Sequence, residues 1–208
     1  MRLPQAVIFD LGKVLVDFDY GIAIQKFASR CSLPEGGLHK LINQSALLFQ
    51  YETGLLTTEQ FFSRITSAAG YGGSFDEFSV VFGDIFTPVP EMVQLPAELR
   101  AKGLPTYLFS NTNDLAIRHI RARFPFIHNF EGCFLSYEHK LMKPDVRFYR
   151  IVEGQTGRTG AELLYLDDRP ENVAAGDALG WQTILHRSPE ETRAALRRLG
   201  LLPQVDEP

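Results

Sequence analysis

Three short apolar runs, each ending at a polar residue, recur along the chain. The runs and their end residues are 6–9 before Asp10, 106–109 before Ser110 and 163–166 before Asp167. Uninterrupted apolar runs of this length are typical of strands that helices cover on both faces. Helical patterns follow the second and third runs, and another strand and helix come after them, at 115–123, 170–179, 182–185 and 189–198. This alternation predicts an α/β fold built on an open, mostly parallel, doubly wound sheet.

Residues 18–88 follow a different pattern. Apolar residues recur there at helical spacing, and no run typical of a buried strand interrupts them. Two capping boxes, Thr57 with Gln60 and Ser74 with Glu77, mark the starts of two of these helices. The predicted domains are an α/β core, residues 1–17 and 89–208, and a small helical cap, residues 18–88.

The polar residues that end the strands indicate where a site would form. In α/β proteins ligands bind beyond the carboxyl ends of the parallel strands, and we expect Asp10, Ser110 and Asp167 to gather at that edge. The helical insert follows the first strand directly, so it should lie over the same edge, where it can act as a lid.

Composition and charge exclude several classes of protein. The chain has 208 residues, of which 45% are hydrophobic, and this excludes a disordered chain and suits one domain with a modest insertion. Its 21 basic and 25 acidic residues give a net charge of −4, and no basic run is present. We therefore do not expect nucleic acid as a partner.

Cysteine usage and apolar length bear on the location of the protein. Cys31 and Cys133 lie far apart without a Cys/His cluster, so we expect two small buried apolar side chains instead of a disulfide or a zinc site. No stretch has the roughly 18 apolar residues that a bilayer span requires, and the run before Asp10 is too short for a secretory signal. We expect a cytoplasmic protein with no membrane partner and with a frayed tail from Pro203 onward.

Three aspartates at neighbouring strand ends predict a metal site. Like charges about 4 Å apart repel by on the order of 4 kcal/mol at an effective dielectric near 20, so Asp167 and Asp168 beside Asp10 require a compensating cation. All-oxygen ligands suit Mg²⁺ better than zinc. The alternative is that Asp168 caps the helix at Pro170 and that Asp167 is hydrogen-bonded within a turn.

Phosphate chemistry is the second prediction for this edge. A strand-held carboxylate such as that of Asp10 can attack a phosphorus atom beside a metal, giving an aspartyl phosphate that water later hydrolyses. Ser110 and Asn111, in the segment LFSNTN, offer donors for phosphate oxygens. The alternative for these two residues is a polar turn that caps the following helix.

A lysine before a proline is the third candidate. Lys143 precedes Pro144 at an expected helix start, where a positive charge opposes the helix dipole, so a negative charge elsewhere must hold it. It would neutralise the attacking carboxylate and the transferred phosphoryl group. A solvated loop lysine is the alternative, and Lys140 is the competing candidate.

Four segments in this order resemble the motifs of the haloacid dehalogenase (HAD) superfamily. The segments are FDLGKVLVD, LFSNTN, LMKPD and YLDDRPENVAAGDALGW. The resemblance spans Val7 to Trp181 and implies a Rossmann-like HAD fold of subfamily IA with a type 1 helical cap. The Asp-Leu-Gly opening and the Ser-Asn-Thr-Asn segment are similar, more narrowly, to the α-D-glucose-1-phosphate phosphatase type.

The resemblance implies a role for each motif residue. It implies Asp10 as the nucleophile, Lys143 as the charge stabiliser, and Mg²⁺ as the cofactor. The implied phosphate binders are Ser110, Asn111 and Lys143, and the implied metal ligands are Asp10, the carbonyl oxygen of Gly12, Asp168 and, with it, Asp167.

Gly12 departs from the pattern of the family. Most family phosphatases have a second aspartate there, which protonates the leaving oxygen and then activates water. A glycine keeps the carbonyl oxygen for the metal but does neither task. The candidates that could substitute are Lys13, Asp17, His139 and the cap residue Glu52; Tyr51 and Phe62 of the cap are further possible substrate contacts or ordinary helical residues.

These observations predict a magnesium-dependent phosphatase of small phosphomonoesters that works through an aspartyl phosphate. A sugar 1-phosphate would depend least on the missing acid, because its leaving hydroxyl is more acidic than an ordinary alcohol. The alternatives are a metal-independent haloacid dehalogenase and a non-catalytic protein that binds a phosphorylated ligand. The sequence leaves the substrate and the oligomeric state open.

Overall fold

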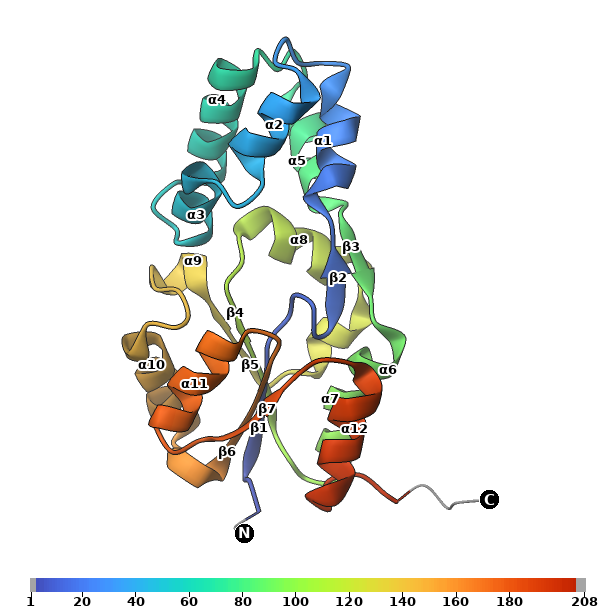
Figure 1. Ribbon diagram of the computed structural model, residues 1–208, viewed down its shortest axis with the longest axis vertical. Helices are drawn as coiled ribbons and strands as arrows, with labels where there is room; N and C mark the ends of the chain where they lie inside the picture. Colours follow the sequence, from blue (N-terminus) through green and yellow to red (C-terminus); the bar gives the residue numbers. More distant parts are fainter. Residues whose placement is uncertain (1–2, 205–208) are drawn as a thin grey trace.

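A five-stranded parallel sheet forms the centre of the core (Figure 1). The computed structural model describes residues 3–204, so the last four residues of the expected frayed tail lie outside the described residues. The strands, in the order in which they pair, are β5 Gly132–Leu135, β4 Thr106–Ser110, β1 Ala6–Phe9, β6 Leu163–Asp167 and β7 Gln182–Leu185. The predicted α/β class and parallel sheet are confirmed. Strand β5 was not predicted, because Gly132 and Cys133 weaken its short apolar run.

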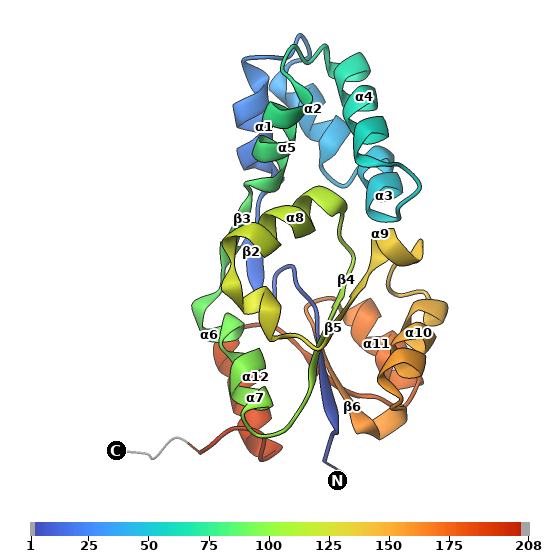
Figure 2. The same cartoon turned by 180° about the vertical axis from the view of Figure 1, so that it is seen from behind.

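Helices cover both faces of this sheet because successive residues of a strand point to opposite sides. Val7 and Phe9 pack in the cluster that includes residues of α7, α8 and α12, whereas Ala6 and Ile8 pack with α10. Figures 1 and 2 show α7 and α12 on one side and α10 and α11 on the other. The core helices are α6 Pro90–Val93, α7 Leu95–Arg100, α8 Asp114–Arg123, α9 Ser136–His139, α10 Val146–Thr156, α11 Pro170–Ala178 and α12 Pro189–Arg198, with 3-10 turns at Pro125–Asn129 and Gly160–Glu162.

A bundle of five helices lies over the carboxyl ends of the strands (Figure 1). Its helices are α1 Tyr20–Ala28, α2 Glu35–Ile42, α3 Ala46–Glu52, α4 Thr58–Ala69 and α5 Phe75–Gly83. Thr57 with Gln60 and Ser74 with Glu77 form the two predicted capping boxes, at the starts of α4 and α5. The bundle has a largely aromatic core of its own, which also takes in Leu115 of α8.

A two-stranded antiparallel ribbon joins the bundle to the core. Its strands are β2 Val16–Phe18 and β3 Phe86–Pro88, and Asp17 pairs with Thr87. The ribbon coincides with the predicted domain boundaries. Whether residues 18–88 and the rest of the chain fold as separate domains stays a prediction.

The structure bears on two further expectations, the burial of the two cysteines and the absence of a membrane-spanning segment. Cys31 and Cys133 are free thiols, and both are only partly buried, whereas we expected buried side chains. Neither belongs fully to a core because each lies at the edge of an apolar cluster. Within residues 3–204, the helices are too short or too polar for any of them to cross a membrane.

The aromatic core of the bundle should carry much of its stability. Phe78 is fully buried and packs in parallel against Phe27 at a ring-centroid distance of 5.0 Å. We expect Phe78→Ala to lower the free energy of unfolding by about 3–5 kcal/mol, because it leaves a cavity. Val80→Ala on the same helix is the control: its side chain is 68% exposed, and we expect a change below about 0.5 kcal/mol. Denaturant titration measures both, and similar losses in the two variants would contradict the prediction.

Candidate active site

The polar ends of β1, β4 and β6 meet at the edge of the sheet that faces the helical bundle. A cavity of about 440 Å³ opens there. The core contributes one part of its lining and the bundle with its ribbon contributes the other: Asp10, Gly12, Lys13, Asn111, Met142, Lys143, Asp168, Arg169 and Asn172 from the core, and Phe18, Tyr20, Asn43, Gln44, Ser45, Leu48, Phe49 and Glu52 from the rest. Of the three strand-end residues expected to gather here, Asp10 lines this cavity, Asp167 has a carboxylate oxygen within 4.8 Å of one of Asp10, and Ser110 lines a second, smaller cavity.

Asp10 lies at the floor of the cavity, directly after β1. Its N–H donates to the carbonyl oxygen of Leu166 (2.9 Å), which fixes the backbone against β6. Its Oδ1 accepts from the N–H of Leu11 (2.7 Å) and from Nζ of Lys143 (2.9 Å). Burial raises the pKa of this carboxyl to about 7, although the Lys143 ammonium opposes the rise.

Lys143 is the cation that holds the cluster together. Its Nζ donates to Asp167 Oδ2 (2.6 Å) and to the carbonyl oxygen of Phe109 (2.8 Å), besides contacting Asp10. Burial alone would lower the pKa of the ammonium, but the two carboxylates outweigh it and raise the pKa above its usual value. The predicted need for a negative charge near Lys143 is met, whereas Lys140 is exposed.

The helix expected to start at Pro144, directly after Lys143, starts later in the chain. Helix α10 begins at Val146, and its N-cap is Asp145, whose carboxylate accepts from the N–H of Arg147. Lys143 therefore lies in the turn before the helix, and its side chain reaches the carboxylates of Asp10 and Asp167 at the strand ends.

Asp167 is fully enclosed by donors. Besides Lys143, the hydroxyl of Tyr165 and the side-chain amide of Asn172 donate to its Oδ2, and the N–H of Arg169 and the same amide donate to its Oδ1. These bonds hold the pKa of Asp167 below its usual value in spite of burial, with Lys143 as the main cause. The alternative expected from the sequence, a hydrogen-bonded turn, describes part of this arrangement.

Asp168 is half-buried and lines the cavity. Burial and the neighbouring Asp167 raise the pKa of its carboxyl. It does not cap α11, because the N-cap of that helix is Arg169 and no side chain caps it. Carboxylate oxygens of Asp10, Asp167 and Asp168 lie within 4.8 Å of one another, so the donor set suits a hard divalent cation.

The side chains of Ser110 and Asn111 differ in whether their polar atoms are already hydrogen-bonded within the protein. The side chain of Asn111 bonds both backbone groups of Lys143: Nδ2 donates to its carbonyl oxygen (3.0 Å), and Oδ1 accepts from its N–H (2.8 Å). The hydroxyl of Ser110 makes a long 3.4 Å bond to the carbonyl oxygen of Asn111 and lines a small cavity of about 40 Å³ that adjoins the larger one. Neither residue caps α8, since Asn113 does so.

The space beside Gly12 is filled by an aromatic ring. A Cβ built on Gly12 would lie 2.8 Å from Cε1 of Phe18, which is inside van der Waals contact. Phe18 belongs to the ribbon strand β2 and packs edge-on against Tyr20. A side chain at position 12 would therefore require this ring to move.

Several residues of the site were not selected from the sequence. Tyr165 and Asn172 donate to Asp167, and both lie within the fourth quoted motif, which was the available signal. Phe18 and Tyr20 line the cavity without any signal in the local pattern.

Of the cap residues considered from the sequence, Glu52 lines the cavity and two others do not. The hydroxyl of Tyr51 bonds Thr58 and the N–H of Leu115, and Phe62 packs edge-on against Phe75. The ordinary helical interpretation therefore holds for Tyr51 and Phe62.

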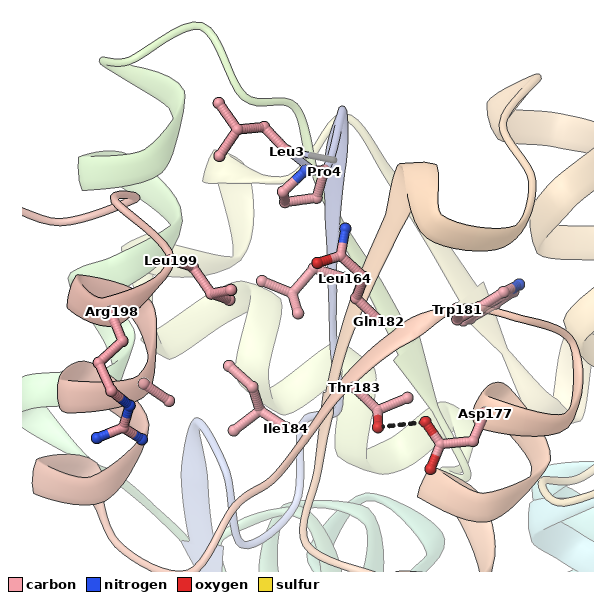
Figure 3. Close-up of a pocket in the computed structure, with 11 residues that line it drawn as sticks. Leu3, Pro4, Leu164, Asp177, Trp181, Gln182, Thr183, Ile184, Arg198 and Leu199 are labelled. Atoms are coloured by element: carbon pink, nitrogen blue, oxygen red, sulfur yellow. Dashed lines mark hydrogen bonds between the residues drawn. The ribbon is translucent and has the colours of Figure 1, made fainter. Parts of the chain in front are cut away.

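A larger cavity of about 860 Å³ lies along β7, away from the acidic cluster (Figure 3). Arg198 and Leu199 lie on one side of it, and Trp181 and Asp177 on the other, with a hydrogen bond of 2.6 Å from Thr183 to Asp177. Asp10, Lys143 and Asp168 do not line it. Size alone would thus select the wrong cavity, and the clustered charged groups select the smaller one.

Comparisons with known proteins agree with this site. The chain is 30% identical over 179 residues to the sesquiterpene phosphatase astK of Aspergillus oryzae, covering 85% of this chain and 86% of that protein. It is 23% identical to the D-ribitol-5-phosphate phosphatase of Bacteroides thetaiotaomicron, covering 91% and 95%. A crystal structure of a HAD family enzyme from the same bacterium, in complex with magnesium and inorganic phosphate, superposes with a TM-score of 0.77 at 26% identity, covering 88% of this chain and 94% of that one.

The narrower likeness to the glucose-1-phosphate phosphatase type stays a prediction.

A family model described as haloacid dehalogenase-like hydrolase matches residues 4–180, which is most of the chain and includes all the residues of the acidic cluster. This protein belongs to the haloacid dehalogenase-like hydrolases.

Proposed function

We propose that this protein is a magnesium-dependent phosphatase that hydrolyses small phosphomonoesters through an aspartyl phosphate on Asp10. The observation that carries the proposal is the acidic cluster in a cavity that the core and residues 18–88 line together, with Asp10 paired with Lys143 and close to Asp168. Two relatives named as phosphatases and a similar enzyme crystallised with magnesium and phosphate support it.

Asp10 would act as the nucleophile. Its two hydrogen bonds, from Leu11 and Lys143, both end on Oδ1, so Oδ2 is the oxygen that attacks phosphorus. The bonds hold the carboxylate in one orientation before substrate arrives, which lowers the entropic cost of the attack. Water would then hydrolyse the aspartyl phosphate and regenerate the carboxylate.

The phosphoryl oxygens would be bound at the end of β4. The hydroxyl of Ser110 and the backbone N–H of Asn111 supply donors, and the ammonium of Lys143 neutralises the charge that develops on phosphorus oxygens. Because both polar atoms of the Asn111 side chain already bond Lys143, we propose that this side chain positions the lysine and does not itself bind phosphate.

Asp10, Asp168 and the carbonyl oxygen of Gly12 would hold Mg²⁺. When bound, the cation neutralises the phosphate and favours the ionised form of Asp10, which burial otherwise disfavours. Asp167 contributes negative charge to the same cluster, and we propose that it acts mainly through Lys143, because donors already surround both of its oxygens.

The alcohol part of the ester would contact the helical cap, residues 18–88. The cap side of the cavity combines the apolar side chains of Phe18, Leu48 and Phe49 with the polar ones of Asn43 and Gln44. A volume of about 440 Å³ suits a small molecule. We keep sugar 1-phosphates as the first substrates to test. Because of the apolar residues in the lining, we also test phosphate esters of apolar alcohols.

The nucleophile is tested by Asp10→Asn. We expect the variant to lose phosphatase activity by on the order of 10³-fold or more, because an amide cannot form the acyl phosphate. A phosphomonoester panel with Mg²⁺ measures the loss, and acid-quenched wild-type enzyme should carry phosphate on Asp10.

The matched control for this variant is Asp177→Asn, which removes a carboxylate from the β7 cavity and should change turnover less than twofold. Equal turnover by Asp10→Asn and wild type would overturn the proposed role. A wild-type protein that binds phosphate but turns over no ester would indicate the non-catalytic binding protein instead.

The metal is tested by chelation. We expect a chelator to abolish phosphatase activity and Mg²⁺ to restore it, since the site concentrates negative charge that a cation must offset. Asp168→Asn should raise the Mg²⁺ concentration for half-maximal activity by at least about 10-fold. Turnover of 2-haloacids in the presence of the chelator would favour the dehalogenase alternative.

A further inference from the structure

The proposed phosphatase lacks a carboxyl group at position 12, and in this structure an aromatic ring takes the place where one would be. The ring of Phe18 occupies the space into which a side chain at Gly12 would extend, at 2.8 Å from the first atom of that side chain. An ester whose alcohol is a poor leaving group nevertheless needs a proton, and the water of the second step needs a base. The proton donor must therefore come from another part of the cavity wall.

Three of the four residues that the sequence offered as substitutes for the missing carboxyl group do not fit that role. Lys13 lines the cavity, but its ammonium is paired with the exposed Asp17 and has no lone pair with which to accept a proton from water. The hydrogen bond from Lys13 lowers the pKa of Asp17, so this carboxyl is a poor acid, and it does not line the cavity. The ring of His139 packs against Phe148 in the core and does not line the cavity either.

Glu52 is the candidate that faces the cavity. It lies at the C-terminal end of α3, and it lines both the main cavity, together with Asp10, and the small cavity at Ser110. Its Oε1 accepts a hydrogen bond of 3.1 Å from the hydroxyl of Tyr20, which also lines both cavities. Glu52 is thus a carboxyl group of the cap that lines both cavities and is hydrogen-bonded to a second cap residue.

The backbone of Glu52 is anchored to the core. Its carbonyl oxygen accepts a bond of 2.6 Å from the hydroxyl of Ser136, at the start of α9. The hydroxyl of the next residue, Thr53, donates to the carbonyl oxygen of Phe49 (2.6 Å) and lies 2.8 Å from the sulfur of Met142, beside Lys143. The end of α3 that carries Glu52 is therefore tied to the core beside the site, although it belongs to the cap.

We propose that Glu52 is the general acid and base of this enzyme and replaces the carboxyl that Gly12 lacks; this inference rests on the proposed phosphatase function. In the first step the Glu52 carboxyl gives its proton to the ester oxygen as the bond from that oxygen to phosphorus breaks and Asp10 Oδ2 bonds to phosphorus. In the second step the Glu52 carboxylate takes a proton from water as the water oxygen bonds to phosphorus and Asp10 is released. The proton lost in one step is regained in the other, so no further reactant is needed.

The protonation state of Glu52 agrees with both steps. Burial raises the pKa of its carboxyl to about 7, opposed by the hydrogen bond from Tyr20 and by the charge of Arg169. A carboxyl with a pKa near neutrality is protonated often enough to act as an acid and ionised often enough to act as a base. Tyr20 acts through Glu52 and is a positioning residue.

The experiment compares first-turnover and steady-state rates of Glu52→Gln on two esters. Nitrophenolate needs no proton to leave, so p-nitrophenyl phosphate should give a burst close to one nitrophenolate per enzyme, at a rate within about threefold of wild type, followed by slow turnover. A simple alkyl phosphate should show no burst, and its first turnover should fall by about 10²- to 10⁴-fold. Tyr20→Phe should give the same pattern with a loss of about 5-fold.

Glu59→Gln is the matched control, because Glu59 is an exposed carboxyl in the first turn of α4, and it should change neither rate. Three results for Glu52→Gln would each overturn the role of Glu52. They are an equal loss of rate on both esters without a burst, a change in KM alone, and no loss of rate. A failure of the proposed function is seen separately: wild type would lack activity with Mg²⁺, or Asp10→Asn would keep it, and either result overturns both proposals. If Asp10→Asn abolishes the wild-type activity and Glu52→Gln loses the same share of activity on both esters, only the role of Glu52 is overturned.

Discussion

A single buried ammonium group holds the centre of this protein together. Nζ of Lys143 lies 2.9 Å from Asp10 and 2.6 Å from Asp167, and its side chain is 1% exposed. Without it, two buried carboxylates at neighbouring strand ends would repel each other, and a buried charge left unpaired costs about 3–5 kcal/mol. Strand pairing already fixes the ends of β1 and β6, and the ammonium adds the turn before α10 to them while it offsets the repulsion between their carboxylates.

The two carboxylates that share this ammonium differ because their other neighbours differ. Asp167 also accepts from Tyr165, Asn172 and the backbone, so its pKa is lowered, whereas Asp10 is held by fewer donors and burial raises its pKa. Carboxyl groups whose environments separate their pKa values take different roles. The lining of the cavity is divided in a similar way: the core contributes the charged groups Asp10, Lys143 and Asp168, and residues 18–88 contribute the apolar side chains of Phe18, Leu48 and Phe49.

Most of the fold follows from local patterns. Strands β1, β4, β6 and β7 were predicted because short, uninterrupted apolar runs mark strands buried on both faces. Only the start of helix α10 was predicted, at Pro144, although Phe148, Tyr149 and Val152 recur at helical spacing and are buried. The signal was present there, whereas for β5 the residues Gly132 and Cys133 provide little of it.

The sequence by itself determined the chemistry of the site: which carboxylates end the strands, which lysine precedes a proline, and that position 12 offers no carboxyl group. Only the tertiary structure decided that the amide of Asn111 is used on Lys143, that Phe18 fills the space at Gly12, and that Glu52 faces the cavity. Periodicity and turn chemistry act over a few residues, and so they can be read along the chain. Contacts between residues that are dozens of positions apart depend on how whole helices and strands pack, and no local pattern encodes that packing.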